Sequence, residues 1–136
     1  MRLFDTTFLI DLVNEDRGAV GLAEKVDLEN SFRAVSVVTV YEYLLGVHSV
    51  YYNNAKLLRE KLESANRDLS PFEILPLTNE IARESSKLQA SLQRRGRMLG
   101  LNDLYIASTA SNLKLSLVTR NTDDFKKVPD LNIESY

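Results

Sequence analysis

The chain has 136 residues, 44% of them hydrophobic and 26% charged, and no stretch of Pro or Gly indicates a linker, so we expect one domain over residues 1–136. The absence of cysteine excludes disulfides and thiolate metal sites, the single histidine excludes a zinc site built from several histidines, and a net charge of −2 argues against a general nucleic-acid coat protein. No apolar stretch approaches the roughly 20 residues that span a bilayer, and acids interrupt the apolar N-terminus, so we expect a cytoplasmic protein with no membrane partner.

The first part of the chain predicts strands that each lead into a helix. Residues 1–4 predict a short strand, and Thr6 or Thr7 caps the helix after it. Residues 34–38 are rich in β-branched side chains and predict a second strand, after which Thr39 caps another helix.

The remainder of the chain continues the same alternation. Gly46 interrupts or ends the second helix, and residues 50–65 predict a further helix. Residues 72–77 predict a strand at the edge of a sheet, or one that ends at its proline, because proline cannot donate to a strand ladder. Thr78 starts a long helix and Asn102 caps the next one. The last expected elements are a strand over 115–119, a helical turn over 123–127 and a strand over 131–135.

This order predicts an α/β fold in three layers, with a central, mostly parallel sheet of about five strands between two layers of helices. Parallel strands need a crossover, and helical crossovers cover both faces of the sheet. Ligands of such sheets bind beyond the carboxyl ends of the strands. Four polar residues lie just after a predicted strand or in the first turn of a predicted helix: Asp5, Glu42, Asp103 and Asn121.

Each of these residues also has an ordinary structural interpretation. Asp5 suits a turn or a helix cap, and Glu42 stands three residues after Thr39, as in a capping box. Asp103 is favoured at a helix start by the helix dipole whether or not it binds anything. Asn121 and Asp124 suit an Asx turn followed by a solvated acid.

The prediction of a site depends on these acids meeting. Carboxylates that cluster either take up protons or are neutralised by a cation. Oxygen ligands without Cys or His favour Mg²⁺ or Mn²⁺ over zinc. Such an ion would activate a water and stabilise the charge that builds on a phosphate, so no serine, cysteine or histidine nucleophile would be needed.

Four segments of the sequence, in this order and at these separations, resemble the PIN-domain family, and within it the VapC-like toxins of toxin–antitoxin pairs. A single Asp-Thr-Thr would carry little weight, whereas the four together extend across nearly the whole chain. They are Leu3–Asp11, Val35–Glu42, Leu101–Ala107 and Val118–Phe125.

The resemblance implies a metal-dependent ribonuclease with a 5′-phosphate product, which forms a homodimer and is held silent by a cognate antitoxin protein. It assigns Asp5, Glu42 and Asp103 to a Mg²⁺ or Mn²⁺ site. The family's fourth acidic position falls on Asn121, and Asp124, three residues on, is the alternative ligand. This departure leaves open whether one or two ions bind.

The same resemblance places Thr6 and Thr119 at small hydroxyl positions that line the site, although both also suit the termination of a helix or strand. Arg94, Arg95 and Arg97 form a basic cluster that suits either a solvated helix end or contacts to RNA phosphates. Two other functions remain open from the sequence: a PIN-like module that binds RNA or protein without cutting, and another metal-dependent nuclease or phosphoesterase.

Overall fold

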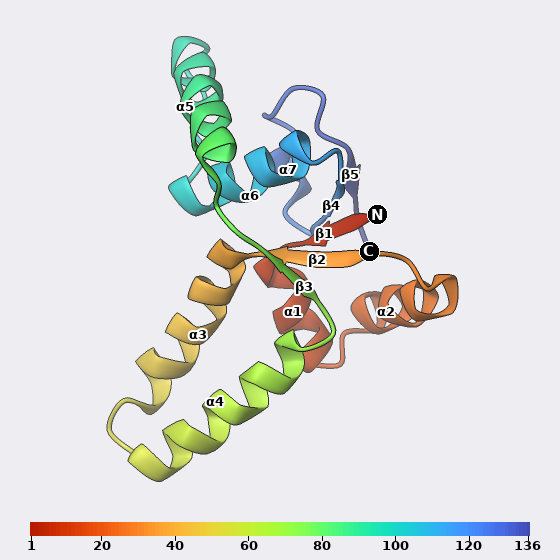
Figure 1. Ribbon diagram of the computed structural model, residues 1–136, viewed down its shortest axis with the longest axis vertical. Coiled ribbons are helices and arrows are strands. Elements are labelled where there is room, and N and C mark those ends of the chain that lie inside the picture. The colour runs from red at the N-terminus through yellow and green to blue at the C-terminus, as the bar shows by residue number, and fades with distance from the viewer.

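A computed structural model describes all residues from 1 to 136, and one sheet lies at its centre (Figure 1). The strand order is β3-β2-β1-β4-β5, and every neighbouring pair is parallel. The strands are β1 (Arg2–Phe4), β2 (Arg33–Ser36), β3 (Glu73–Leu75), β4 (Ser116–Val118) and β5 (Ile133–Glu134). The helices are α1 (Thr6–Val13), α2 (Arg17–Glu29), α3 (Val37–Tyr51), α4 (Ala55–Leu69), α5 (Asn79–Arg94), α6 (Leu101–Asn112) and α7 (Thr122–Phe125). The α/β fold with a parallel five-stranded sheet is therefore confirmed.

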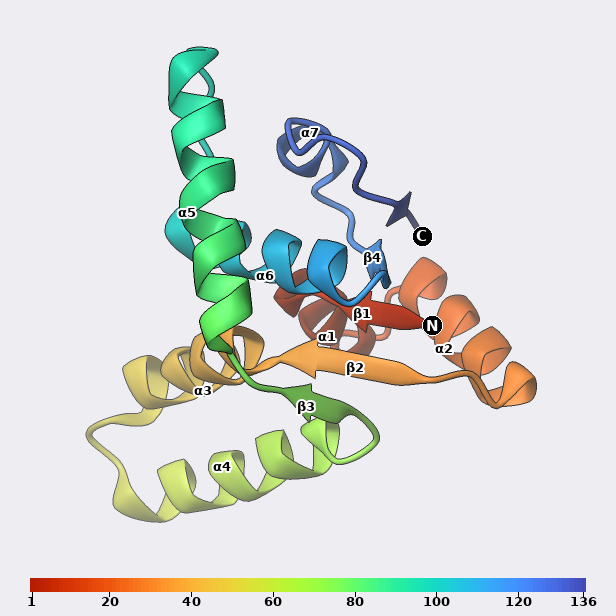
Figure 2. The same cartoon turned by 45° about the horizontal axis from the view of Figure 1, so that its top comes forward.

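Helices cover both faces of the sheet, and each face has its own core. Successive strand residues point to opposite faces, so Leu3 and Phe4 belong to different clusters, each almost fully buried. Leu3 packs with buried residues of α6, including Ile106 and Ala107. Phe4 packs with buried residues of α1 and α2, such as Phe8. Figures 1 and 2 show the same arrangement, with α5, α6 and α7 on one side of the sheet and α1 and α2 on the other.

Helix α1 begins one residue earlier than predicted. Asp5, and not Thr6 or Thr7, is its N-cap, because the Asp5 carboxylate accepts a hydrogen bond from the Phe8 N–H at 3.1 Å. Strand β1 ends at Phe4, so the acid falls at the first extended position before the helix.

Helix α3 also starts earlier than predicted, so the proposed capping box is wrong. Ser36 is the N-cap, and its hydroxyl accepts from the Val38 N–H. Thr39 therefore lies inside the helix, fully buried, and Glu42 lies in the second turn, where it has no cap to complete. Strand β2 ends at Ser36 because the chain turns into the helix as soon as it leaves the sheet. The Glu42 side chain is thereby left available for other contacts.

Three other boundaries differ from the sequence-based expectation. Helix α6 follows Gly100, which offers no side-chain cap, so Asn102 lies within the helix. Gly46 does not interrupt α3, which continues to Tyr51, and α4 begins only at Ala55. The sequence analysis predicted no element in the region of α2, although Asp16 caps that helix. Two glycines in its first half weaken the helical pattern.

The short strand β3 lies at one edge of the sheet, next to β2 alone, and it ends before Pro76. The expectation of an edge strand that ends at this proline is confirmed. None of the helices is both long enough and apolar enough to cross a bilayer.

Candidate active site at the carboxyl edge of the sheet

The residues singled out from the sequence lie on elements that meet at one edge of the sheet. Asp5 follows the central strand β1, and Glu42 lies on the helix that follows β2. Asn121 and Asp124 follow β4, on the other side of β1. Asp103 lies in the first turn of α6, the helix that leads into β4, so its start faces the same edge. Figure 2 shows β2 running toward the N-terminal end of α3.

Strand β1 has β2 as its neighbour on one side and β4 on the other. The strand order therefore reverses between β1 and β4, which makes this boundary a topological switch point. Open α/β sheets bind their ligands at such a point, because the connections diverge there and leave a crevice. Asp5 and Thr119 follow these two strands and are hydrogen-bonded to each other. The expected position for a ligand and the position of the acids therefore agree.

Asp5 is the most constrained of the acids, with only 4% of its surface exposed. One carboxylate oxygen, Oδ1, accepts from the Thr7 hydroxyl at 2.7 Å and from the Phe8 N–H at 3.1 Å. The other, Oδ2, accepts from the Thr119 hydroxyl at 2.5 Å. Burial raises the pKa of Asp5, these hydrogen bonds oppose the rise, and the nearby Glu42 carboxylate adds to it.

Glu42 is half-buried and held from two sides. Its Oε1 accepts from the Thr6 hydroxyl at 2.7 Å, and its Oε2 accepts from the Asn102 amide at 3.3 Å. Thr6 also lies 3.3 Å, between hydroxyl oxygens, from the buried Thr39. The predicted position of Thr6 beside the acids is thus matched by a direct contact to one of them.

Asp103 differs from the other acids because no hydrogen bond to its side chain is present. Burial raises its pKa to about 6, and the negative charges of Glu42, Asp5 and Asp124, in that order, add to the rise. The other three acids therefore all lie within electrostatic reach of Asp103. A carboxylate that is partly desolvated and has no protein partner is an unfavourable arrangement unless something positive binds it.

Asn121 and Asp124 form the other rim of this group. The Asn121 amide donates to Asp124 Oδ2 at 2.9 Å, and the Lys127 ammonium donates to Asp124 Oδ1 at 3.0 Å. These two bonds lower the pKa of Asp124, the Asn121 bond most. The backbone N–H of Asn121 donates to the Thr119 hydroxyl at 3.0 Å, so Thr119 links this rim to Asp5.

The acids do not form a ready-made cage. No three carboxylate or imidazole side chains stand in an arrangement that would coordinate one ion as they are. Like charges without a cation repel, and here three of the four carboxylates are turned to hydroxyl, amide or ammonium donors instead. Mg²⁺ nevertheless suits such a site, because it keeps several waters and binds through one or two carboxylates and the substrate phosphate. The chemistry of the donor set therefore fits a hard divalent ion.

Comparison with known proteins agrees with this architecture. The sequence matches the PIN domain family over residues 2–131, nearly its whole length. The chain belongs to the PIN domain family. The ribonuclease VapC2 of Rickettsia felis is 25% identical over 98% of this PIN-domain chain and 96% of its own. The tRNA(fMet)-specific endonuclease VapC of Salmonella typhimurium is 27% identical over 85% of the chain and 83% of its own.

Solved structures lead to the same family. VapBC2 of Rickettsia felis, bound to a DNA fragment from its promoter, superposes with a TM-score of 0.83 and 26% identity, over 99% of this chain and 98% of that one. Other structures that resemble this PIN domain are toxin–antitoxin complexes. Within the family, the chain is thus a member of the VapC ribonucleases of VapBC toxin–antitoxin systems.

The three arginines named from the sequence lie apart from the acids in this PIN domain. Arg94 ends α5, which Figures 1 and 2 show rising away from the sheet, and Arg95 and Arg97 follow it. All three are exposed, and none pairs with an acid. Their segment does return to the site, because Lys127 donates to the Met98 carbonyl at 2.9 Å as well as to Asp124.

Sequence reasoning missed three groups that contact the acids. Asn102 and Lys127 each donate to an acid, and Thr7 supports Asp5. Lys127 stands three residues after Asp124 in a predicted helical turn, a spacing that favours an ion pair, so a signal for it was present. Asn102 was assigned to a cap that the structure does not have, and this hid its contact with Glu42.

A cavity of about 300 Å³ lies elsewhere, between α5, α6 and the segment before β5. It contains none of the acids described above. The acids lie instead at the carboxyl edge of the sheet, where parallel α/β sheets bind their ligands.

Proposed function

We propose that this chain is an endoribonuclease that hydrolyses RNA phosphodiester bonds with the help of Mg²⁺ or Mn²⁺, and that it is the toxin of a toxin–antitoxin pair. The observation that carries the proposal is Asp103, a half-buried carboxylate with no protein partner that stands among three other acids. Membership of the VapC family supports the choice of RNA as substrate. The name of the Salmonella relative, which specifies a tRNA, makes structured RNA a suitable first substrate.

We assign Asp5 and Asp103 as the principal ligands, with Glu42 completing the set. Asp124 would bind the ion or order a nearby water, and the Asn121 amide holds Asp124 in place. A divalent ion bound there would lower the pKa of a coordinated water and offset negative charge on the phosphate. Of the hydroxyls, Thr119 keeps one Asp5 oxygen oriented, and Thr6 does the same for Glu42. Such supporting contacts fix the direction in which a ligand oxygen points.

The exposed arginines would position the RNA rather than take part in the reaction. Arg94, Arg95 and Arg97 can contact phosphates, which contributes affinity without reading sequence. Lys127 donates to both the Met98 carbonyl and Asp124, so it joins the segment that follows these arginines to the acids. RNA bound along that segment would therefore extend to the acids.

For partners, we propose a cognate antitoxin protein and a second copy of the chain. Toxin–antitoxin complexes among the similar structures support the first. Exposed apolar side chains, among them Tyr41, Leu45, Met98 and Leu101, offer surface for such contacts. An enzyme that acts on cellular RNA works where RNA is present, so the cytoplasm is its expected location.

The test compares the wild type with Asp5→Asn and Asp103→Asn on end-labelled tRNA, in Mg²⁺, in Mn²⁺ and in excess EDTA. Asparagine at position 5 keeps one oxygen for the Phe8 N–H, so the cap and the fold are expected to persist while cleavage is lost. Asp123→Asn is the matched control, because Asp123 is an exposed acid of the same segment. Full cleavage by Asp5→Asn, or by the wild type in EDTA, would refute the mechanism.

The same assay separates the two rival functions. A module that only binds would retain labelled RNA without cutting it in Mn²⁺. Another phosphoesterase would cut DNA of the same sequence, or a simple phosphate ester, as well as it cuts RNA.

A further inference from the structure

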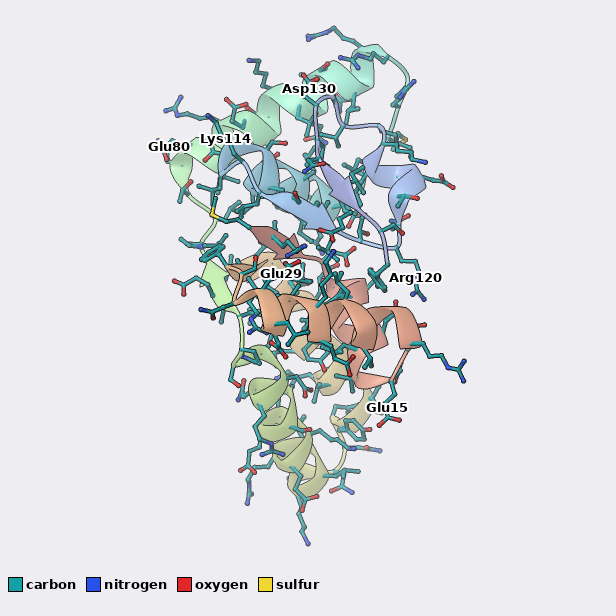
Figure 3. All side chains as sticks on the ribbon, turned by 90° about the vertical axis from the view of Figure 1, so that its right-hand side faces the viewer. Glu15, Glu29, Glu80, Lys114, Arg120 and Asp130 are labelled. Atoms are coloured by element: carbon teal, nitrogen blue, oxygen red, sulfur yellow. The ribbon has the colours of Figure 1, made fainter.

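Tyr136 and Arg120 form a stacked pair beside the site that none of the assignments above uses. The Arg120 guanidinium lies 4.5 Å from the centre of the Tyr136 ring, within the range of a cation–π contact. Arg120 also binds both carboxylate oxygens of Asp16, at 2.8 and 3.0 Å, and Asp16 is the N-cap of α2. Figure 3 shows Arg120 between the strands and the helices on the α2 side of the sheet.

Tyr136 packs against Phe8, one of the two residues that donate to Oδ1 of Asp5. Its ring packs edge-to-face on Phe8, with 5.2 Å between ring centres, and the Phe8 N–H donates to that oxygen. The Tyr136 hydroxyl also donates to Asp11 at 2.7 Å, which ties the same ring to the last turn of α1.

Arg120 is linked to the other carboxylate oxygen, Asp5 Oδ2, through the neighbouring residue Thr119. It follows Thr119, the donor to Asp5 Oδ2, directly in the chain, and its guanidinium is clamped by Asp16 and by the Tyr136 ring. The arrangement leaves little free space: a Cβ built on Gly18 would stand 3.1 Å from an Arg120 nitrogen and 3.1 Å from the Tyr136 backbone. The donors to both oxygens of Asp5 are thus joined through one stacked pair.

We infer that the Arg120–Tyr136 pair is a positioning device that sets the orientation of the Asp5 carboxylate for ion binding and for RNA cleavage. Neither residue touches the reacting atoms. They act through Phe8 and Thr119, which donate to opposite oxygens of the carboxylate. This inference rests on the proposed function of Asp5, because the orientation matters only if that carboxylate is a ligand.

Removing either member is expected to weaken ion binding without weakening RNA binding. Partners that orient a ligand from behind typically contribute about 10-fold to 100-fold in metal affinity or activity. Tyr136→Phe keeps the ring on Phe8 but loses the bond to Asp11 that holds the ring in place, so we expect a loss near the lower value in Mn²⁺ affinity and in kcat. Arg120→Met removes the stacking on Tyr136 and the hydrogen bonds to Asp16. Arg120→Lys keeps the positive charge but lacks the planar guanidinium, so it should keep little more of the Mn²⁺ affinity and kcat than Arg120→Met does.

Matched controls are available for both changes. The Tyr43 hydroxyl donates to Asp68 at 2.8 Å, the same kind of bond as that of Tyr136 to Asp11, but it leads to α4 and not to Asp5. Arg33 pairs with the exposed Asp27 at the start of β2, the far end of the strand from the acids. Tyr43→Phe and Arg33→Met should therefore leave Mn²⁺ affinity and kcat unchanged.

The experiment measures Mn²⁺ affinity by calorimetry without RNA, kcat and KM on labelled tRNA, and hydrogen exchange of the Phe8 amide in metal-free protein, all well below the unfolding temperature. We expect the Tyr136 and Arg120 variants to bind Mn²⁺ about 10-fold more weakly, to lose kcat with KM unchanged, and to exchange the Phe8 amide faster. Unchanged Phe8 exchange, or Mn²⁺ affinity equal to that of the controls, would overturn the inference. A wild type that neither binds Mn²⁺ nor cuts RNA would instead reject the proposed function, while the Phe8 measurement would still decide whether the pair orients Asp5.

Discussion

Replacing Asp103 by asparagine should make the metal-free protein more stable at neutral pH. Burial and three neighbouring acids raise the pKa of Asp103 from 3.8 to about 6. At 1.36 kcal/mol per pKa unit, such a shift would correspond to about 3 kcal/mol. The side chain is only half-buried, so solvent screening reduces the expected effect to about 1 kcal/mol.

The pH dependence has a definite sign. The Asp103 carboxyl group holds its proton more tightly in the folded protein than in the unfolded chain. Asp103 therefore stabilises the folded state least at a pH where the carboxyl group is ionised in both states. Its contribution to stability is lost as pH rises from about 4 through about 6, and it stays lost above that range. The advantage of Asp103→Asn over the wild type should therefore be near zero at pH 4 and complete at pH 7.5.

Urea unfolding followed by circular dichroism, in EDTA at pH 4, 6 and 7.5, measures this difference. At pH 7.5 the gain of about 1 kcal/mol corresponds to a rise of about 3–5 °C in Tm for a chain of this size. Excess Mg²⁺ should reverse the order, because binding at 100 times Kd stabilises the folded wild type by about 2.7 kcal/mol. Asp123→Asn, which removes an exposed charge of the same segment, serves as the control. A metal-free Asp103→Asn that is less stable than the wild type at pH 7.5 would refute the reasoning.

Two further predictions concern the contacts around Asp5 and the surface that meets RNA. Thr119→Val removes a fully buried hydroxyl that is hydrogen-bonded to both Asp5 and the Asn121 N–H. Urea unfolding should therefore show a loss of about 1–3 kcal/mol in the free energy of unfolding. A change below about 0.5 kcal/mol would show that water replaces these bonds. Reversing the charge of the exposed arginines at 94, 95 and 97 should weaken tRNA binding and leave Tm unchanged. The slope of log affinity against log salt concentration should fall by the equivalent of up to about three phosphate contacts, which fluorescence anisotropy at several salt concentrations can measure. An unaltered salt slope would remove these arginines from the RNA surface.

Local sequence patterns located most of the elements but not where several of them begin. Helices α1 and α3 start directly after short strands, so Asp5 and Ser36 become the caps in place of the threonines that follow them. The boundary depends on where strand pairing stops, and pairing is a property of the sheet. The helix of residues 17–29 was missed because two glycines weaken its pattern, whereas in the folded chain Leu22 and Val26 pack in the core beside Phe4.

By itself, the sequence determined the fold class, and it named the acids that we propose as ligands. Alternating strands and helices require a parallel sheet, and acids placed after strands collect at its carboxyl edge. Only the tertiary structure decided what each acid touches. Asp5 is enclosed by donors from both sides, Glu42 is held by Thr6 and Asn102, and Asp103 alone has no partner. Such contacts join residues as much as 114 positions apart, and no local pattern records a distance across the folded chain.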